Sequence, residues 1–314
     1  PISVGTTEEL QARFSASQCR TRVVAMPDLL QEGQALQGFT RSDQMLIGCE
    51  DDWSETQMRE ILRPFNRRKD VIQRVLPREA EFSRLAISAM LATRISFMND
   101  MAASSKTLGI DIDKVRLAMG ADSRIGDSYL YPGCGFGGPG FSRDVMNLAR
   151  VLSDTNVDAG LLERVLQINE SQKELLFRLF WQHFEGEVSG KKVAIWGLSF
   201  KPQSDRVDNA PALSLAEALW AQDVEIQAHD PAAMGAMSEW AKDRGVIRFY
   251  EDPYSALEGA DALMLVTEWK IYWSPDWDKI RSSLRTPLIL DGRNVYDPKF
   301  MVSQGFTYHG VGRG

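Results

Sequence analysis

The chain has 314 residues, of which 44% are hydrophobic, 9% aromatic and 25% charged. This composition is typical of a globular protein of about two domains and excludes extensive disorder. The net charge of -7 argues against nucleic acid as the main partner, and no apolar run reaches the roughly 18 residues of a membrane span. Three cysteines without a CxxC pair and three scattered histidines predict neither a metal site nor a disulfide framework, so we expect a cytoplasmic protein.

The N-terminal part of the chain, residues 1–76, has the pattern of half an α/β domain. Strand candidates lie at 22–25 (RVVA) and 44–48 (QMLIG). One helix candidate precedes each of these strands, and another follows the second strand. At most three strands make a parallel sheet that is too small to stand alone with both of its faces covered. We therefore expect the other half of this domain to precede Pro1.

The middle of the chain is predicted to be helical. From about 79 to 108, small and apolar side chains recur three or four positions apart, and Pro77 just before this run suits a helix start. A second long helix is predicted over about 159–184. Long helices of this kind often form dimer surfaces, and a purely internal bundle explains the pattern equally well.

The loop between these helices contains a glycine motif that imitates a cofactor site. Gly133, Gly135 and Gly138 satisfy G-x-G-x-x-G, which binds a dinucleotide only where a strand ends and a helix begins. No strand is predicted before the motif, and the acidic residue expected about 20 positions later is absent. We therefore reject it as a cofactor loop.

The C-terminal part alternates between strand-like and helical segments, which predicts a doubly wound parallel sheet. An antiparallel α+β domain would instead show paired strands joined by tight turns. The predicted strands are 192–198, 225–230, 247–250, 262–267 and 288–291, and the predicted helices lie near 212–221, 233–244, 254–260 and 277–284.

Eight segments, in the same order along the chain, resemble motifs of the UDP-glucose and GDP-mannose dehydrogenase family, the nucleotide-sugar 6-dehydrogenases. Any single match is weak evidence for the family, whereas eight matches in the same order are strong evidence. The segments are SVGTT at 3–7, MPDLLQEG at 26–33, SDQMLIG at 42–48, AEFSRLAISAMLATRISFMN at 80–99, GFGGPGFSRD at 135–144, GLSFKP at 197–202, TEW at 267–269 and DGR at 291–293.

The resemblance implies an α/β protein with three domains. These are the C-terminal half of an NAD-binding Rossmann domain at 1–76, a central helical dimerisation domain at 77–186, and a nucleotide-sugar-binding α/β domain at 187–314. It also implies NAD as the cofactor, a UDP- or GDP-linked sugar as the ligand, and a homodimer. In the family, the glycine loop for the pyrophosphate lies before the segment that SVGTT resembles, so we expect it upstream of Pro1.

The family's chemistry, as the resemblance implies it, oxidises a primary alcohol to a carboxylate in two hydride transfers. A cysteine thiolate captures the intermediate aldehyde, which suits the high nucleophilicity of thiols. The position of that cysteine falls at Gly140, which has no side chain. Cys134, six residues earlier, is the alternative nucleophile, and we interpret it as a structural thiol.

Other catalytic positions of the family have also changed in this sequence. The catalytic lysine and asparagine of the family fall at Arg84 and Ser88, and its glutamate falls at Asp28. Arginine stays protonated and cannot exchange a proton. The family's aspartate is retained as Asp144, which also fits a second interpretation, a carboxylate that stabilises a helix N-terminus. Asn99 is retained as well.

The positions that hold the ligand in the family are better preserved. The resemblance assigns diphosphate and sugar contacts to Lys201 and Arg293, and it assigns Arg124 to the site of a neighbouring subunit. Cations beside a pyrophosphate are the expected chemistry. The aromatic loop at 129–137 resembles the segment that surrounds uridine and sugar, and its candidate contacts are Tyr131, Phe136 and Gly137.

The cofactor contacts match the family less well. Glu32 is retained as a candidate NAD contact, but the arginine expected beside the dinucleotide falls at Asp208, which would repel a phosphate. Three hypotheses stay open. The chain is a catalytically silent relative that keeps a nucleotide-sugar pocket within polysaccharide precursor metabolism, an NAD-dependent oxidoreductase of altered chemistry that uses an upstream cofactor loop, or a structural dimer partner of an intact paralogue.

Overall fold

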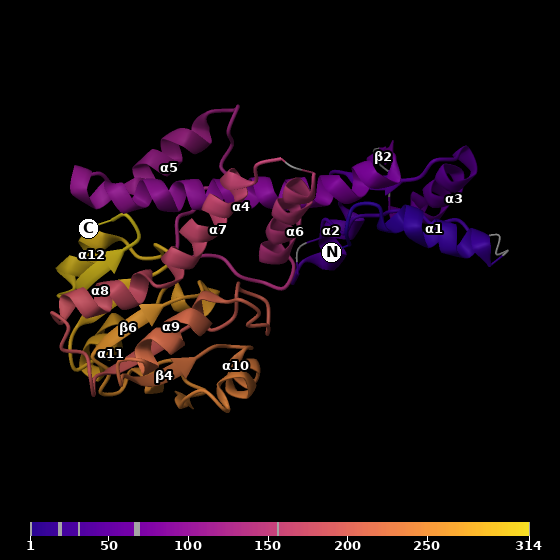
Figure 1. Ribbon diagram of the computed structural model, residues 1–314. Coiled ribbons are helices and arrows are strands. Elements are labelled where there is room, and N and C mark those ends of the chain that lie inside the picture. The colour runs from indigo at the N-terminus through magenta and orange to yellow at the C-terminus, as the bar shows by residue number, and fades with distance from the viewer. Residues whose placement is uncertain (1, 18–20, 31, 66–69, 156, 314) are drawn as a thin grey trace. The chain divides into compact units, whose positions relative to one another are not determined.

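The computed structural model describes residues 2–17, 21–30, 32–65, 70–155 and 157–313 (Figure 1). The chain divides into two compact units, which we call the first and the second unit. The first comprises Pro1–Met90 with Arg143–Leu162, and the second comprises Leu91–Ser142 with Glu163–Gly314. The two boundaries between the three domains expected from the sequence stay a prediction. Within the described ranges, no helix is long and apolar enough to cross a membrane.

The first unit is built on a two-stranded parallel sheet in which Met45 pairs with Ile72. Both side chains pack in a small core with Leu62. The strand predicted at 22–25 is wrong, because that segment forms only an isolated bridge between Ala25 and Gly48. The strand at 72–75 (IQRV) was not predicted, because four residues are too few to show a clear alternation of apolar and polar side chains. The elements are α1 (Thr6–Ala16), α2 (Ala35–Thr40), β1 (Met45–Gly48), α3 (Asp52–Leu62), the 3-10 helix η1 (Arg63–Phe65), β2 (Ile72–Val75), the start of α4 (Pro77–Leu108) and most of α6 (Phe141–Asp154).

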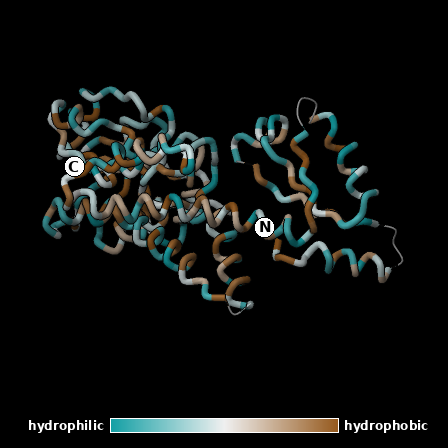
Figure 2. The backbone as a smooth tube through the Cα atoms, turned by 90° about the horizontal axis from the view of Figure 1, so that it is seen from above, coloured by the Kyte–Doolittle hydropathy of each residue, from teal (hydrophilic) through white to brown (hydrophobic). Residues whose placement is uncertain are grey.

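The long helices follow the predicted ones with one difference. Helix α4 begins at Pro77 as expected, and hydrophobic residues recur along it (Figure 2). The single helix predicted over 159–184 is instead two, α7 (Gly160–Lys173) and α8 (Leu175–His183). At the break, the Arg178 guanidinium donates to the carbonyl of Ser171 at 2.8 Å. In an unbroken helix that carbonyl accepts from the backbone N–H four residues later, so the side chain replaces a helical hydrogen bond.

The second unit contains a six-stranded parallel sheet in the order β5-β4-β3-β6-β7-β8, which confirms the predicted doubly wound fold. All five predicted strands are present, and β8 adds a sixth. The helix predicted at 254–260 is a single 3-10 turn. The elements are α5 (Ile112–Ala121), α7, α8, β3 (Lys192–Trp196), α9 (Pro211–Trp220), β4 (Glu225–His229), α10 (Met234–Ala241), β5 (Ile247–Phe249), η2 (Ser255–Leu257), β6 (Ala262–Leu265), η3 (Lys270–Tyr272), α11 (Trp277–Ser283), β7 (Leu288–Asp291), α12 (Pro298–Ser303) and β8 (Thr307–Gly310).

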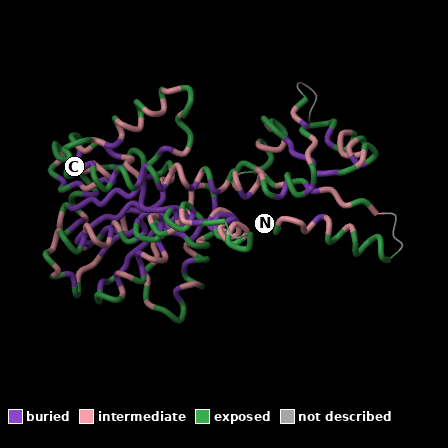
Figure 3. The backbone as a smooth tube through the Cα atoms, turned by 45° about the horizontal axis from the view of Figure 1, so that its top comes forward, coloured by how far each residue is buried: buried purple, intermediate pink, exposed green. Residues whose placement is uncertain are grey.

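Helices cover both faces of this sheet, so its four inner strands β4, β3, β6 and β7 are largely buried, whereas the edge strand β5 is not (Figure 3). Side chains alternate along each strand: Val193 and Ile195 pack with α8 and α9, whereas Ala194 and Trp196 pack with η2 and α11. The order of the strands reverses between β3 and β6. In open α/β sheets, ligands bind beyond the carboxyl ends of the strands at such a reversal.

Candidate functional site

A pocket of about 280 Å³ lies in the second unit. It brings together three of the predicted substrate-binding residues, Tyr131, Phe136 and Arg293. Arg293 follows β7 directly, so the pocket adjoins the carboxyl ends of the strands where the topology favours a ligand. The full lining is Ile95, Tyr129, Tyr131, Gly133, Gly135, Phe136 and Arg293, of which Ile95 carried no sequence signal for a site.

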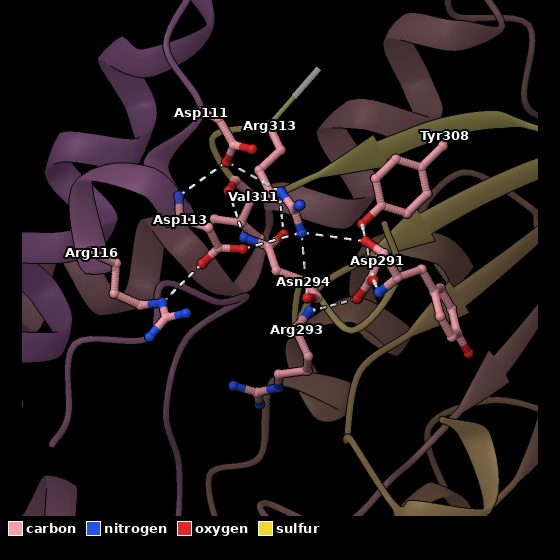
Figure 4. A network of polar contacts seen from close by, with 10 residues as sticks. Asp111, Asp113, Arg116, Asp291, Arg293, Asn294, Tyr308, Val311 and Arg313 are labelled. Carbon is pink, nitrogen blue, oxygen red and sulfur yellow. Dashed lines mark hydrogen bonds and ion pairs between the residues drawn. The ribbon is translucent and has the colours of Figure 1, made fainter. Parts of the chain in front are cut away.

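Arg293 is held in place by groups on two strand ends. Its Nε donates to the carbonyl of Val266 at 2.7 Å and lies 3.2 Å from a carboxylate oxygen of Glu268. Its backbone N–H donates to the buried Asp291, at 2.9 Å, which also accepts from the hydroxyl of Tyr308 (Figure 4). The side chain is 16% exposed. The turn is therefore fixed by a buried carboxylate, and it presents a well-oriented cation to the pocket.

Two buried asparagines hold the loop that forms the other part of the pocket. Asn99 on α4 accepts from the backbone N–H of Gly133 at 2.8 Å. Asn169 on α7 accepts from the N–H of Phe136 at 2.8 Å and donates to its carbonyl at 3.1 Å. Asparagine is unfavourable inside a helix, so its presence there is a signal by which Asn169 could have been found. The loop is thereby held rigidly without secondary structure of its own.

Gly137 does not line the pocket but sets how closely the loop approaches the segment after β3. A Cβ at Gly137 would lie 2.3 Å from the carbonyl oxygen of Asn209. The Asn209 side chain accepts from Lys173 at 2.7 Å and donates to Ser142 at 2.9 Å. Lys173, with a side chain only 1% exposed, also pairs with Glu170 at 2.9 Å, so its buried charge is compensated. No pattern in the sequence had indicated this buried lysine.

Two further predicted ligand contacts do not line this pocket. The ammonium of Lys201 lies 5.7 Å from the centre of the Phe200 ring. Arg124 pairs with Asp122 at 2.6 Å, and its side chain is 86% exposed. The sequence placed Arg124 in the site of a neighbouring subunit, and that role stays a prediction.

Cys134 has the environment of a structural thiol. It is 1% exposed, and its thiol points to the carbonyl of Val266 at 3.7 Å. Burial raises the pKa of this thiol above its ordinary value, against the opposing effect of Arg293. A neutral, enclosed thiol is a poor nucleophile. Cys19 lies outside the described residues.

The first unit gathers four of the five predicted catalytic residues. Ser88 on α4 donates to Asp144 on α6 at 3.0 Å, and Arg84 lies 3.3 Å from the same carboxylate oxygen. Arg84 also lies 3.9 Å from Asp28. Asp144 is 1% exposed, and its second oxygen accepts no hydrogen bond from the described residues. Gly140 directly precedes α6, in whose first turn Asp144 lies, so both interpretations of Asp144 remain compatible with its position.

Carboxylates cap the described strand-to-helix turns of the first unit. After β1, the Asp51 carboxylate accepts from the N–H of Ser54 at 2.8 Å and caps α3, whose first turn also holds Asp52 and Glu55. After β2, Glu79 accepts from the N–H of Leu76 at 2.7 Å. Carboxylates therefore accept hydrogen bonds from backbone amides at these two helix starts. The predicted cofactor contact Glu32 lies in a turn before α2, and Asp208 accepts from Arg206 at 2.9 Å.

The doubly wound sheet and the arginine-lined pocket beyond its strands define a nucleotide-binding α/β protein. Comparison with known proteins narrows this class. Residues 78–171 match the central domain of the UDP-glucose/GDP-mannose dehydrogenase family, and residues 194–298 match its UDP binding domain. The chain belongs to this family.

The relatives found in the comparison agree with this assignment. A UDP-glucose 6-dehydrogenase of Pseudomonas aeruginosa is 42% identical over 99% of this chain and 71% of its own length. One from Rhizobium meliloti is 31% identical over 99% of this chain and 72% of its own length. The solved structure of a UDP-glucose dehydrogenase from Pyrobaculum islandicum superimposes with a TM-score of 0.88 at 29% identity, over 100% of this chain and 69% of that one.

Proposed function

We propose that this chain binds a UDP- or GDP-linked sugar in the pocket of the second unit and does not oxidise it by itself. The observation that carries the proposal is the placement of Arg293 beside an aromatic loop at the carboxyl ends of β6 and β7. A guanidinium forms bidentate, charge-assisted hydrogen bonds to phosphate oxygens. The pocket volume of about 280 Å³ lies near the lower end, about 300 Å³, of small-molecule sites.

We infer that the chain does not oxidise the sugar because it lacks a suitable nucleophile. Gly140 has no side chain at the position where the family resemblance places a cysteine. Cys134 is enclosed, and its raised pKa keeps it protonated. NAD is the cofactor that the family implies, and we propose that this chain does not hold it by itself, because Asp208 stands where the resemblance places an arginine.

The remaining elements of the proposal rest on the family resemblance. Lys201 would contact the ligand in the same subunit, and Arg124 would reach the site of a second copy. We propose a homodimer of three-domain chains, divided near 76/77 and 186/187. A role in polysaccharide precursor metabolism in the cytoplasm belongs to the same proposal.

Calorimetric titration with UDP-glucose and with GDP-mannose tests the binding. We expect at least one ligand to bind the wild-type chain, and Arg293→Ala to weaken this binding about tenfold or more through loss of charge-assisted contacts. Arg285→Ala is the matched control, because Arg285 pairs with Asp261 at 3.2 Å beside the amino end of β6, away from the pocket. If neither ligand binds at millimolar concentration, the proposal fails and the structural dimer partner gains support.

A second candidate is an oxidoreductase of altered chemistry. The cluster around Asp144 favours it, because this retained aspartate has one buried oxygen without a hydrogen-bond partner among the described residues. NADH formation from a nucleotide sugar, at one equivalent per sugar and abolished by Asp144→Asn, would support this candidate over the silent one.

A further inference from the structure

The last described residues of the chain, Val311–Arg313, lie across two parts of the second unit. We call this segment the strap. Arg313 lies 3.3 Å from Asp111 and 3.1 Å from Asp113, the residues that begin α5 (Figure 4). Its side chain is only 11% exposed. The N–H of Ile112 donates to the carbonyl of Gly312 at 3.1 Å, so backbone and side chain both attach the strap to α5.

From Asp113 the contacts continue to the pocket. While one oxygen of Asp113 contacts Arg313, the other accepts from Arg116 at 3.0 Å. The guanidinium of Arg116 lies 4.2 Å from the centre of the Tyr131 ring, in a cation–π contact. Tyr131 lines the pocket and is 60% exposed, so few other contacts restrain its ring. A single carboxylate thus connects the strap to one wall of the pocket.

The strap also holds the residue that follows Arg293. Asn294 donates to the carbonyl of Val311 at 2.9 Å and accepts from its N–H at 2.8 Å. Asn294 has a φ of 54°, a left-handed conformation that costs free energy for a residue other than glycine. This reciprocal pair stabilises that conformation. Arg313 adds a hydrogen bond to the carbonyl of Tyr296 at 3.3 Å, so the turn that carries Arg293 is fastened at two points.

We propose that the strap is a positioning element of the binding pocket, which sets Tyr131 through Asp113 and Arg116, and Arg293 through Asn294. The proposal rests on the proposed function for its effect on ligand affinity. Its structural part concerns only the placement of the Tyr131 ring, and that part can be measured without ligand. Arg116, Asp113 and Arg313 are positioning residues, because none of them lines the pocket.

The contacts explain how the carboxylate of Asp113 affects the Tyr131 ring, which it does not touch. Asp113 and Arg116 have side chains that are 19% and 14% exposed, so their charges are partly desolvated. Removing the charge of Asp113 leaves Arg116 without the partner that orients its guanidinium over the ring. The ring of Tyr131, on a loop without regular structure, then gains rotational freedom. Ordering it again on ligand binding costs affinity.

The first measurement is made without ligand, on the full chain labelled with 3-fluorotyrosine. Fluorine NMR gives a resonance for Tyr131, which Tyr131→Phe assigns. We expect this resonance to shift in both Arg313→Met and Arg116→Met, and to stay in place in Arg285→Met, which breaks an ion pair with Asp261 elsewhere in the same unit. Two independent variants are used so that poor folding of one leaves the other. An unmoved resonance in a folded variant overturns the proposal.

The second measurement is a double-mutant cycle on the affinity for UDP-glucose. Arg116→Met should weaken binding about threefold to tenfold in the wild-type background. It should have no effect on binding in the Tyr131→Ala background. A purely structural role would lower the melting temperature and leave the affinity of the folded protein unchanged, which overturns the positioning role. If the wild type binds no nucleotide sugar while the fluorine resonance still shifts, the proposed function fails and the placement of Tyr131 by the strap stands.

Discussion

Asp144 keeps two polar neighbours, Ser88 and Arg84, although the residue four positions before it has no side chain. Arginine cannot take up the proton that an alcohol must lose. The cluster therefore keeps the carboxylate and lacks both a nucleophile for covalent catalysis and a neighbouring group that exchanges a proton.

We predict that replacing the missing thiol alone restores no activity. We expect no NADH from NAD and UDP-glucose with the wild-type chain or with Gly140→Cys, because Arg84 and Ser88 remain unchanged. NADH absorbance over time is the measurement. Steady turnover by the wild type would contradict the proposed loss of oxidation, and turnover by Gly140→Cys alone would show that the other positions still function.

Cys134 gives a second prediction at the residue scale. Its folded-state pKa lies above the ordinary value of 9.0, so the folded protein holds the proton to higher pH than the unfolded chain does. The stability that this thiol contributes is therefore complete below about pH 9 and is lost as the pH rises through the folded-state pKa. Urea unfolding at a series of pH values should show an alkaline loss of stability that is smaller in Cys134→Ala.

Alkylation provides an independent check on the same thiol. At about pH 8.5, iodoacetamide should modify Cys134 slowly in the folded chain and rapidly after unfolding, as peptide mass spectrometry can follow. Rapid modification in the folded state would make Cys134 an available nucleophile and reopen the alternative considered for it.

At the scale of elements, the loop over 129–140 depends on close packing against the segment after β3. Gly137→Ala would place a methyl group where the Asn209 carbonyl lies, 2.3 Å away. We expect a loss of about 1–3 kcal/mol in unfolding free energy together with weaker ligand binding, because the loop must move outward. Calorimetric melting and titration measure the two effects.

The matched control for this substitution is Gly235→Ala on α10, where a Cβ meets nothing within 4 Å. It should leave binding unchanged and be neutral or stabilising by up to about 1 kcal/mol, because alanine favours a helix over glycine. Equal losses in both variants would mean that the contact with Asn209 does not constrain the loop.

At the scale of the whole molecule, α4 carries an exposed apolar stripe. Phe97, Met101 and Leu108 are 47%, 38% and 66% exposed, and their spacing of four and seven positions places them on one face of the helix. Exposed apolar residues gathered on one face commonly mark a contact surface. This agrees with the homodimer proposed from the sequence.

We therefore expect the chain to be a dimer at micromolar concentration, as light scattering can determine. Phe97→Glu should shift it toward monomer, because a charge would be buried without a partner. Val302→Glu, at a position on α12 that is 65% exposed, should leave the dimer intact. If the wild type is a monomer, the homodimer proposal fails, and the role proposed for Arg124 fails with it.

Much of the fold could be predicted because local patterns record burial. The five strands predicted in the second unit and the start of α4 at Pro77 follow from apolar runs and a helix-start signal. The failures have local causes too. The segment at 22–25 has strand-forming residues but only one bridge, and Arg178 interrupts a helix whose apolar spacing continues through the break.

The candidate site could be predicted only in part. Tyr131, Phe136 and Arg293 lie at one pocket, and Arg84, Ser88, Asp28 and Asp144 lie in one cluster, while the roles that the resemblance implies for them stay predictions. Lys201 and Gly137 lie outside the pocket lining. The buried Asn169 and Lys173 had not been singled out, because a lone polar residue in a helical pattern does not reveal its partner.

The sequence by itself determined the class of fold, the order of the motifs and the absence of a side chain at Gly140. These properties depend on residue identity and on short-range periodicity. Only the tertiary structure decided that Cys134 is enclosed, that carboxylates occupy the helix starts of the first unit, and that Arg313 reaches Asp113. Such contacts join residues far apart in the chain, and their geometry is set by how helices and strands pack, which no local pattern specifies.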